Sequence, residues 1–236
     1  MSIAENVAAI RAQIAEAARA AGRDPAEVKL CAATKMNDAD AVRQAIAAGV
    51  DLCGENRVQE LTQKLSQNAY EGAPVHFIGH LQTNKVKQVV GKVEVIQSVD
   101  SLRLLEAIQK EAAKQGIRQD ILLEVNVGGE ESKSGFAPEE ILPLVDRFSA
   151  FSNIRLLGLM AIPPVCEKSG GNDKFFQEML SLAVDITAKK SDNVRVDILS
   201  MGMSGDFADA VRCGSTMIRV GTAIFGARDY SKSHQA

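Results

Sequence analysis

The sequence predicts a closed (β/α)8 barrel of the α/β class, and three observations favour this fold. Eight short apolar runs rich in Val, Ile and Leu recur along the 236-residue chain. Helix-like stretches separate them, and continuous apolar runs are typical of parallel strands that are buried on both faces. Eight strand-then-helix units in about 250 residues are the usual content of one barrel domain. We therefore expect residues 1–236 to form a single domain.

The expected strands and helices alternate along the chain. The apolar runs occupy residues 28–34, 50–53, 75–78, 93–97, 121–127, 154–160, 196–201 and 216–220. The clearest helical stretches between them are 38–48, 57–68, 101–115, 138–150 and 173–190. An open doubly wound sheet is the alternative, but the G-x-G-x-x-G turn of its dinucleotide-binding version is missing after the first run.

An amphipathic helix precedes the first strand. Ile3, Val7, Ile10, Ile14 and Ala17 recur at spacings of four and three, which places them on one helical face. The opposite face carries as many acidic as basic residues, so we expect packing against the core rather than on a membrane surface.

Composition excludes several classes of protein. The net charge of −3 argues against a nucleic-acid partner, and no run approaches 18 uncharged apolar residues. We expect the basic residues Lys85, Lys87 and Lys92 on an exposed helix face, and they are too few to indicate RNA binding. Four scattered cysteines and three widely spaced histidines predict neither disulfides nor a metal site. The amino terminus lacks the features of a signal peptide, so we expect a cytoplasmic protein.

Lys35 directly follows the first apolar run, VKLCAAT. Functional residues of this fold lie at the carboxyl ends of the strands. A lysine that is partly desolvated there has a lowered pKa and is a nucleophile able to form a Schiff base with an aldehyde. The alternative is an ordinary strand-end lysine whose amine extends into solvent.

The loops after the seventh and eighth strands predict an anion site. Gly221 and Thr222 follow the eighth strand at the start of a short helix-like segment, and Ser204 follows the seventh. Backbone N–H groups and hydroxyls at these loops are the usual phosphate site of this fold. Turn and capping chemistry explains each residue alone equally well. Together with Lys35, however, they suit a phosphorylated aldehyde.

Six motifs in the same order as in one family extend over nearly the whole chain. They are AATK (32–35), GENRVQE (54–60), HFIGHLQTNK (76–85), NVGGEESKSG (126–135), LSMGMSGD (199–206) and RVGTAIFG (219–226). The chain thus resembles the pyridoxal-phosphate homeostasis protein family, the proline synthetase co-transcribed bacterial homologue. That family is similar to the N-terminal barrel of alanine racemase. The resemblance implies a fold-type III barrel that lacks the C-terminal β domain of the racemase.

The resemblance also implies roles for particular residues. Pyridoxal 5'-phosphate (PLP) is the implied cofactor, with Lys35 as the Schiff-base lysine. The other implied cofactor-binding residues are Asn56 and Met201 beside the ring, Arg219 at the ring nitrogen, and Ser204, Gly221 and Thr222 at the phosphate. Two departures from the family pattern affect the rim and its packing, namely Met36-Asn37-Asp38 after the lysine and Cys53 before the GEN motif.

The expected function is PLP homeostasis without an assigned reaction or catalytic residue. A two-base racemase needs a tyrosine opposite the lysine, and neither Tyr70 nor Tyr230 is placed for that role. Two alternatives stay open: a barrel-only racemase or other PLP enzyme, and a Schiff-base aldolase acting on a phosphorylated sugar. We expect a monomer, because the dimerising β domain of the racemases is absent. The expected partners are PLP and PLP-dependent client enzymes.

Overall fold

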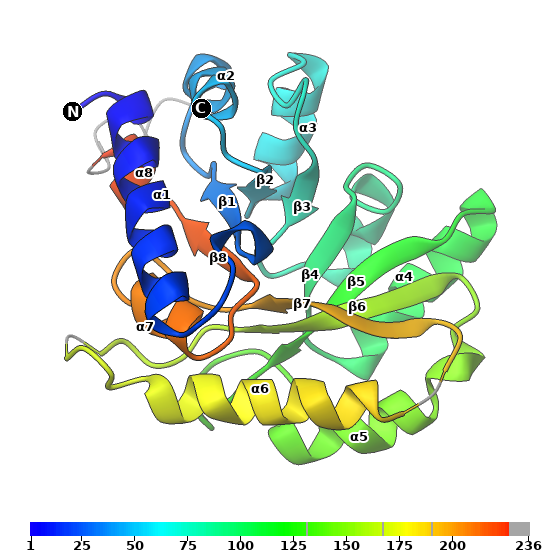
Figure 1. Ribbon diagram of the computed structural model, residues 1–236. Coiled ribbons are helices and arrows are strands. Elements are labelled where there is room, and N and C mark those ends of the chain that lie inside the picture. Colours follow the sequence, from blue (N-terminus) through cyan, green and yellow to red (C-terminus); the bar gives the residue numbers. More distant parts are fainter. Residues whose placement is uncertain (131, 167, 190, 227–236) are drawn as a thin grey trace.

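The computed structural model describes residues 1–226 except 131, 167 and 190. Eight parallel strands in sequence order close into a barrel, which confirms the predicted fold class (Figure 1). The strands are β1 (Lys29–Ala33), β2 (Leu52–Glu55), β3 (Val75–Phe77), β4 (Val95–Val99), β5 (Gln119–Val125), β6 (Ile154–Ala161), β7 (Val194–Ser200) and β8 (Met217–Val220). Each of the eight apolar runs therefore overlaps a strand, although most strand ends differ from the run ends by one or two residues.

Helices follow most of the strands and cover the outside of the barrel. They are α1 (Ile3–Ala20), α2 (Ala39–Ala47), α3 (Val58–Ser66), α4 (Leu102–Gln115), α5 (Pro138–Asp146), α6 (Asp173–Thr187), α7 (Phe207–Arg212) and α8 (Thr222–Phe225). Short 3-10 helices are η1 (Pro25–Glu27), η2 (Thr83–Gln88) and η3 (Phe148–Ala150).

Two connections differ from the sequence prediction. Residues 138–150 form α5 and then η3, with a break after Asp146. Pro143 lies inside α5, and it weakens that helix because proline has no N–H to donate to the preceding turn. The connection between β3 and β4 is η2, so Lys85 and Lys87 lie on a 3-10 segment rather than on an α-helical face.

Barrel closure brings the first and last strands side by side. In the β1–β8 pair, Lys29 aligns with Met217, Cys31 with Arg219 and Ala32 with Val220. The carboxyl ends of both strands therefore meet at the same edge. Residues that follow β1 and β8 are neighbours there, although they come from opposite ends of the sequence.

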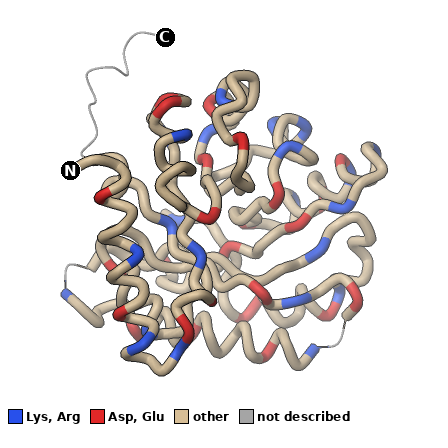
Figure 2. The backbone as a smooth tube through the Cα atoms, turned by 45° about the horizontal axis from the view of Figure 1, so that its top comes forward, with Lys and Arg blue, Asp and Glu red and all other residues tan. Residues whose placement is uncertain are grey.

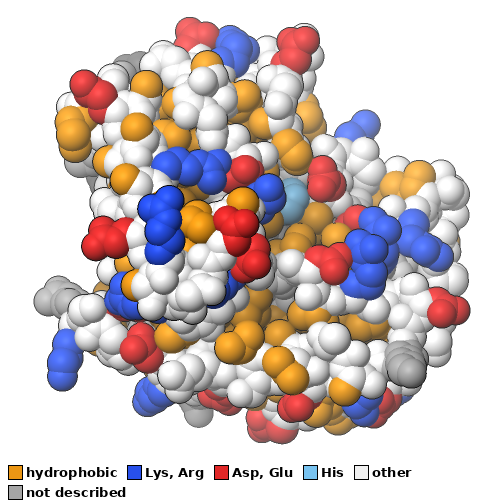
Figure 3. All heavy atoms as spheres, viewed as in Figure 1, with side chains coloured by type: hydrophobic (Ala, Val, Ile, Leu, Met, Phe, Trp, Pro, Cys, Tyr) orange, Lys and Arg blue, Asp and Glu red, His pale blue; other side chains and the backbone are white. Residues whose placement is uncertain are grey.

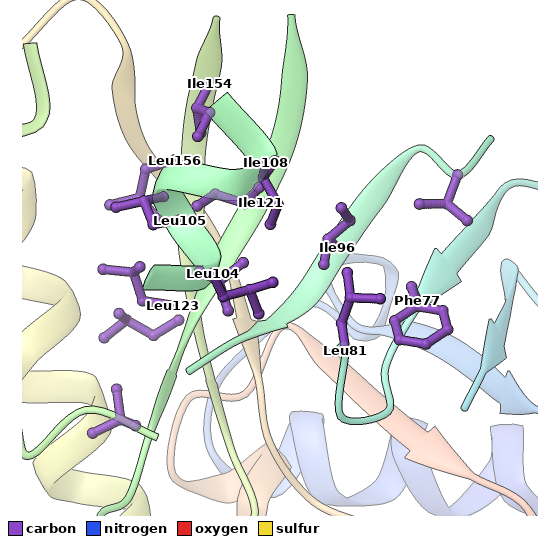
Figure 4. Close-up of a cluster of buried hydrophobic side chains, with 14 of the residues drawn as sticks. Phe77, Leu81, Ile96, Leu104, Leu105, Ile108, Ile121, Leu123, Ile154 and Leu156 are labelled. Carbon is purple, nitrogen blue, oxygen red and sulfur yellow. The ribbon is translucent and has the colours of Figure 1, made fainter. Parts of the chain in front are cut away.

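The hydrophobic core lies mainly between the strands and the surrounding helices. Leu104, Leu105 and Ile108 of α4 point toward the side chains of β5 and β6 (Figure 4). Ile121 and Leu156 of those strands are fully buried. Close packing of this layer holds the strands at the distances that the barrel needs.

The amino-terminal helix α1 belongs to the same core. A capping box at Ser2 and Glu5 starts it, with Ser2 N donating to Glu5 Oε2 at 2.7 Å. Its apolar face, including Ile10 and Ile14, packs in one cluster with Leu30 of β1 and Ile218 of β8. The expected core packing of this helix is therefore observed.

Charged residues are distributed over the whole barrel. Lys and Arg positions are interspersed with Asp and Glu positions over the backbone (Figure 2). On the face seen in Figure 3, basic and acidic side chains lie close to one another rather than in separate patches. None of the helices in the described part of the chain combines the length and apolar content that a membrane crossing requires.

The packing of α1 generates a stability prediction. We expect Ile14→Ala to lower the free energy of unfolding by about 2–5 kcal/mol, because it leaves a cavity in a buried cluster. Urea denaturation measures the loss, and Gln13→Ala on the exposed face of the same helix is the control. Equal stability of the two variants would contradict a core role for α1.

Candidate functional site

A cavity of about 820 Å³ lies at the carboxyl ends of the strands. Six of the seven predicted cofactor residues line it together: Lys35, Asn56, Ser204, Arg219, Gly221 and Thr222. They come from the ends of four strands, β1, β2, β7 and β8. The fold therefore collects an amine, an amide, a guanidinium and two hydroxyls around one space.

The seventh predicted residue, Met201, does not line this cavity. It is fully buried in the hydrophobic cluster between the strands and the helices, together with Leu199 and Ala210. Met203, which the sequence analysis did not select, lines the cavity instead. It belongs to the same LSMGMSGD motif, so the motif indicated a loop that reaches the cavity, although Met201 itself does not line it.

Lys35 lies on a tight turn that follows β1. Its side chain is half-buried and lines the cavity, and its carbonyl accepts a hydrogen bond from Asn37 Nδ2 at 3.0 Å. The next residue, Met36, has a φ of 61°. This left-handed conformation costs residues with a Cβ roughly 1–2 kcal/mol, so contacts elsewhere must stabilise the turn.

A buried carboxylate lies beneath this turn. Glu55 is fully buried at the end of β2, and its Oε2 accepts hydrogen bonds from Lys64 Nζ at 2.6 Å and from Tyr70 Oη at 3.1 Å. Thr34, the residue before Lys35, donates to the same oxygen at 3.1 Å. Burial, with the carboxylate of Glu55, raises the pKa of Tyr70. The Tyr70 hydroxyl is therefore a neutral donor, and Tyr70 does not line the cavity. The other tyrosine, Tyr230, lies outside the described residues.

The part of the cavity wall next to the Lys35 turn is formed by the loops after β7 and β8. Thr222 begins α8, and the first N–H groups of a helix have no acceptor within the helix. Ser204 lies on a turn that is closed by hydrogen bonds between Met203 and Asp206, with Met203 N donating to Asp206 Oδ1 at 2.7 Å. The other carboxylate oxygen of Asp206 accepts from Asn172 Nδ2 at 3.0 Å. The exposed residues Ser204 and Thr222 thus lie at an edge of the cavity whose backbone is held by these hydrogen bonds, and their hydroxyls and N–H groups suit an anion.

Arg219 enters the cavity from the barrel interior. Its guanidinium donates to Ser200 Oγ at 2.6 Å and to the carbonyl of Ala161 at 2.8 Å. Burial lowers the pKa of Arg219, but an arginine has so high an ordinary pKa that it stays a cation. The arrangement provides a fixed donor with no acceptor capacity.

A chain of polar side chains continues from Arg219 into the barrel. Ser200 Oγ donates to Gln97 Oε1 at 2.7 Å, and Gln97 Nε2 lies 2.8 Å from His76 Nδ1. Burial lowers the pKa of His76 to about 4, so this histidine is neutral near pH 7 and its Nδ1 accepts from the amide. The chain holds the guanidinium in one orientation.

Glu124 is a further acidic group in the barrel, and the sequence did not identify it as a candidate site residue. Glu124 of β5 is the one charged residue in the run ILLEVNV. Burial, with the Asp100 carboxylate, raises its pKa to about 7, while Arg219 and His80 oppose the shift. Asp100 itself pairs with His80 Nδ1 at 2.9 Å. Across the described ranges, no group of three or more His, Cys, Asp and Glu side chains is arranged to hold a metal ion.

The two departures from the family pattern lie where the sequence analysis expected them. Met36 and Asn37 line the cavity, and Asp38 caps α2 by accepting from Ala41 N at 2.8 Å. Cys53 is fully buried, and burial raises the pKa of its thiol to about 12. It packs as a small apolar side chain rather than as a reactive group.

Known proteins resemble the whole chain. The family model for the N-terminal domain of alanine racemase matches residues 6–229. A pyridoxal phosphate homeostasis protein of Pseudomonas aeruginosa is 42% identical over 97% of both chains. Its counterpart from Aquifex aeolicus is 40% identical and covers 98% of this chain and 100% of its own. These relatives are named for homeostasis and not as enzymes.

A solved structure is similar as well. PipY of Synechococcus elongatus PCC7942, with PLP bound, superposes with a TM-score of 0.81 at 32% identity. The match covers 95% of this chain and 100% of PipY. The full-length identity and the shared barrel agree with the order of motifs in the sequence. The chain therefore belongs to the pyridoxal phosphate homeostasis protein family, whose barrel is that of the alanine racemase N-terminal domain.

Proposed function

We propose that this protein binds PLP reversibly as a Schiff base on Lys35 and acts in PLP homeostasis in the cell. The observation that carries the proposal is that Lys35 and Arg219 line one cavity together with the hydroxyl residues Ser204 and Thr222. It offers an amine for the aldehyde, donors for the phosphate and a cation for the ring nitrogen. The presence of PLP in the related PipY structure supports the same ligand.

The polar atoms of the cavity fit this cofactor. Asn56 Oδ1 is buried and has no hydrogen-bond partner in the protein, a costly state that a bound polar ligand relieves. In our proposal Asn56 lies on the ring side, and Ser204, Gly221 and Thr222 hold the phosphate; Met201 is buried in the hydrophobic core and does not line the cavity. When bound, PLP supplies an aldehyde and an electron-withdrawing ring. Arg219 keeps the ring nitrogen unprotonated because it can only donate, which makes the ring a weaker electron sink.

This proposal favours a carrier over an enzyme. The buried hydroxyl of Tyr70 bonds to Glu55 and does not reach the cavity as a second base. The curated relatives are named for homeostasis rather than for a reaction. We propose that residues 1–236 form one domain of a monomeric, cytoplasmic protein that delivers PLP to dependent client enzymes. Lys35-dependent loss of optical activity from an L-amino acid would favour the racemase alternative instead.

The first prediction concerns the amine. Purified protein with PLP should show a Schiff-base absorption band that borohydride bleaches, and Lys35→Ala should abolish it. Lys87→Ala is the matched control, because Lys87 is exposed on η2 and does not line the cavity. No band in the wild-type protein would contradict PLP binding and favour the cofactor-free aldolase. An undiminished band in Lys35→Ala would show that another lysine forms the Schiff base.

The second prediction concerns the phosphate. Thr222→Val keeps the side-chain shape but removes a hydroxyl donor, so affinity for PLP should fall by about tenfold or more, as for a hydrogen bond to a charged group. Affinity for pyridoxal, which lacks the phosphate, should stay unchanged. Spectral titration with both compounds measures the difference. An equal loss for the two compounds would place Thr222 away from the phosphate.

A further inference from the structure

We infer that Glu60 and Lys64 of α3 are positioning residues that hold the Lys35 turn in the conformation presenting its amine to the cavity. The inference rests on the proposed function of Lys35. Both peptide groups that flank Lys35 form hydrogen bonds with side chains of α3, so this helix supports the backbone of the turn.

The first contact is on the carboxyl side of Lys35. The N–H of Met36 donates to Glu60 Oε2 at 2.7 Å. Met36 has the left-handed φ of 61°, a conformation that a residue with a Cβ rarely adopts without support. A hydrogen bond to a carboxylate is among the stronger bonds that a backbone N–H can make. Glu60 is thus placed to stabilise the strained residue next to Lys35.

The second contact is on the amino side. Lys64 Nζ donates to the carbonyl of Thr34 at 2.7 Å. It also pairs with Glu55 Oε2 at 2.6 Å and with Glu60 Oε2 at 3.3 Å. The Lys64 side chain is only 6% exposed, and that of Glu55 is fully buried. One ammonium group therefore connects the backbone before Lys35 with the carboxylate that holds the backbone after it.

Burial makes this arrangement rigid. Removing a partner from a buried ion pair leaves an uncompensated charge, so the three side chains resist separation. Glu60 and Lys64 are four residues apart on α3, which keeps both on one helical face. The turn that carries Lys35 is consequently attached to a helix rather than to flexible loop residues. A fixed backbone lowers the entropic cost of placing the amine for reaction with the aldehyde.

Glu60 also lines the cavity, so its two variants are chosen for whether they keep an acceptor for the Met36 N–H. Glu60→Gln keeps an acceptor for the Met36 N–H, whereas Glu60→Met keeps the side-chain length and removes the acceptor. With PLP as probe, Glu60→Met should weaken binding by about tenfold, the equivalent of one lost hydrogen bond to a charged group, and should slow formation of the Schiff-base band. Glu60→Gln should recover most of both quantities.

Gln63→Ala on the exposed face of α3 is the control and should behave as wild type. Equal binding and equal rates in folded Glu60→Met and wild-type protein would overturn the inference, as would a failure of Glu60→Gln to recover them. A wild-type protein that forms no band would instead refute the proposed function.

Hydrogen exchange tests the contact in the ligand-free wild-type protein, whether or not the variants fold. The Met36 amide should exchange slowly, because it is bound to Glu60. Exchange at the rate of an unstructured peptide would overturn the inference independently of any result with PLP.

Discussion

Pairing of β8 with β1 is the constraint on which the candidate site depends. Ala32 and Val220 are partners across this closure, so Lys35 and Thr222 emerge at adjacent points of the same rim. The contact is close at that point: a Cβ on Gly221 would meet the Cβ and carbonyl of Ala33 at 3.4 Å. A sheet left open between these strands would separate the amine from the anion site. Barrel closure and ligand recognition therefore have the same structural cause.

The barrel interior combines apolar packing with a connected polar chain. Burying polar groups costs free energy unless each finds a partner. Here Arg219, Ser200, Gln97 and His76 supply one another with donors and acceptors. Leu122 and Met160 belong to an apolar cluster of their own. Because the polar chain is satisfied internally, the guanidinium is held in place before any ligand arrives. Its orientation depends on residues from four other strands, β3, β4, β6 and β7.

The sequence was sufficient to predict the fold and most of the candidate site. Strand ends could be located from apolar runs, and a parallel barrel places all such ends at one rim. Six of the seven residues that the resemblance implied do line one cavity at this rim. Met201 shows the limit of this reasoning. Side chains alternate across a strand, and a position that shifts by one residue points to the opposite face. Since Ser200 faces Gln97 and Arg219 in the interior, Met201 faces the helices.

Glu60 and Lys64 could not be assigned from sequence for a different reason. A weak signal existed, because Lys64 stands on the buried face of α3 with Val58 and Leu61, where an apolar residue is expected. Such a lysine indicates a tertiary partner without identifying it, and the partners here are Glu55 and the backbone of Thr34. The conformation of the Lys35 turn is therefore a property of the tertiary structure. Met36 illustrates this point, since its side chain disfavours the local backbone conformation and the contact with Glu60 supports it.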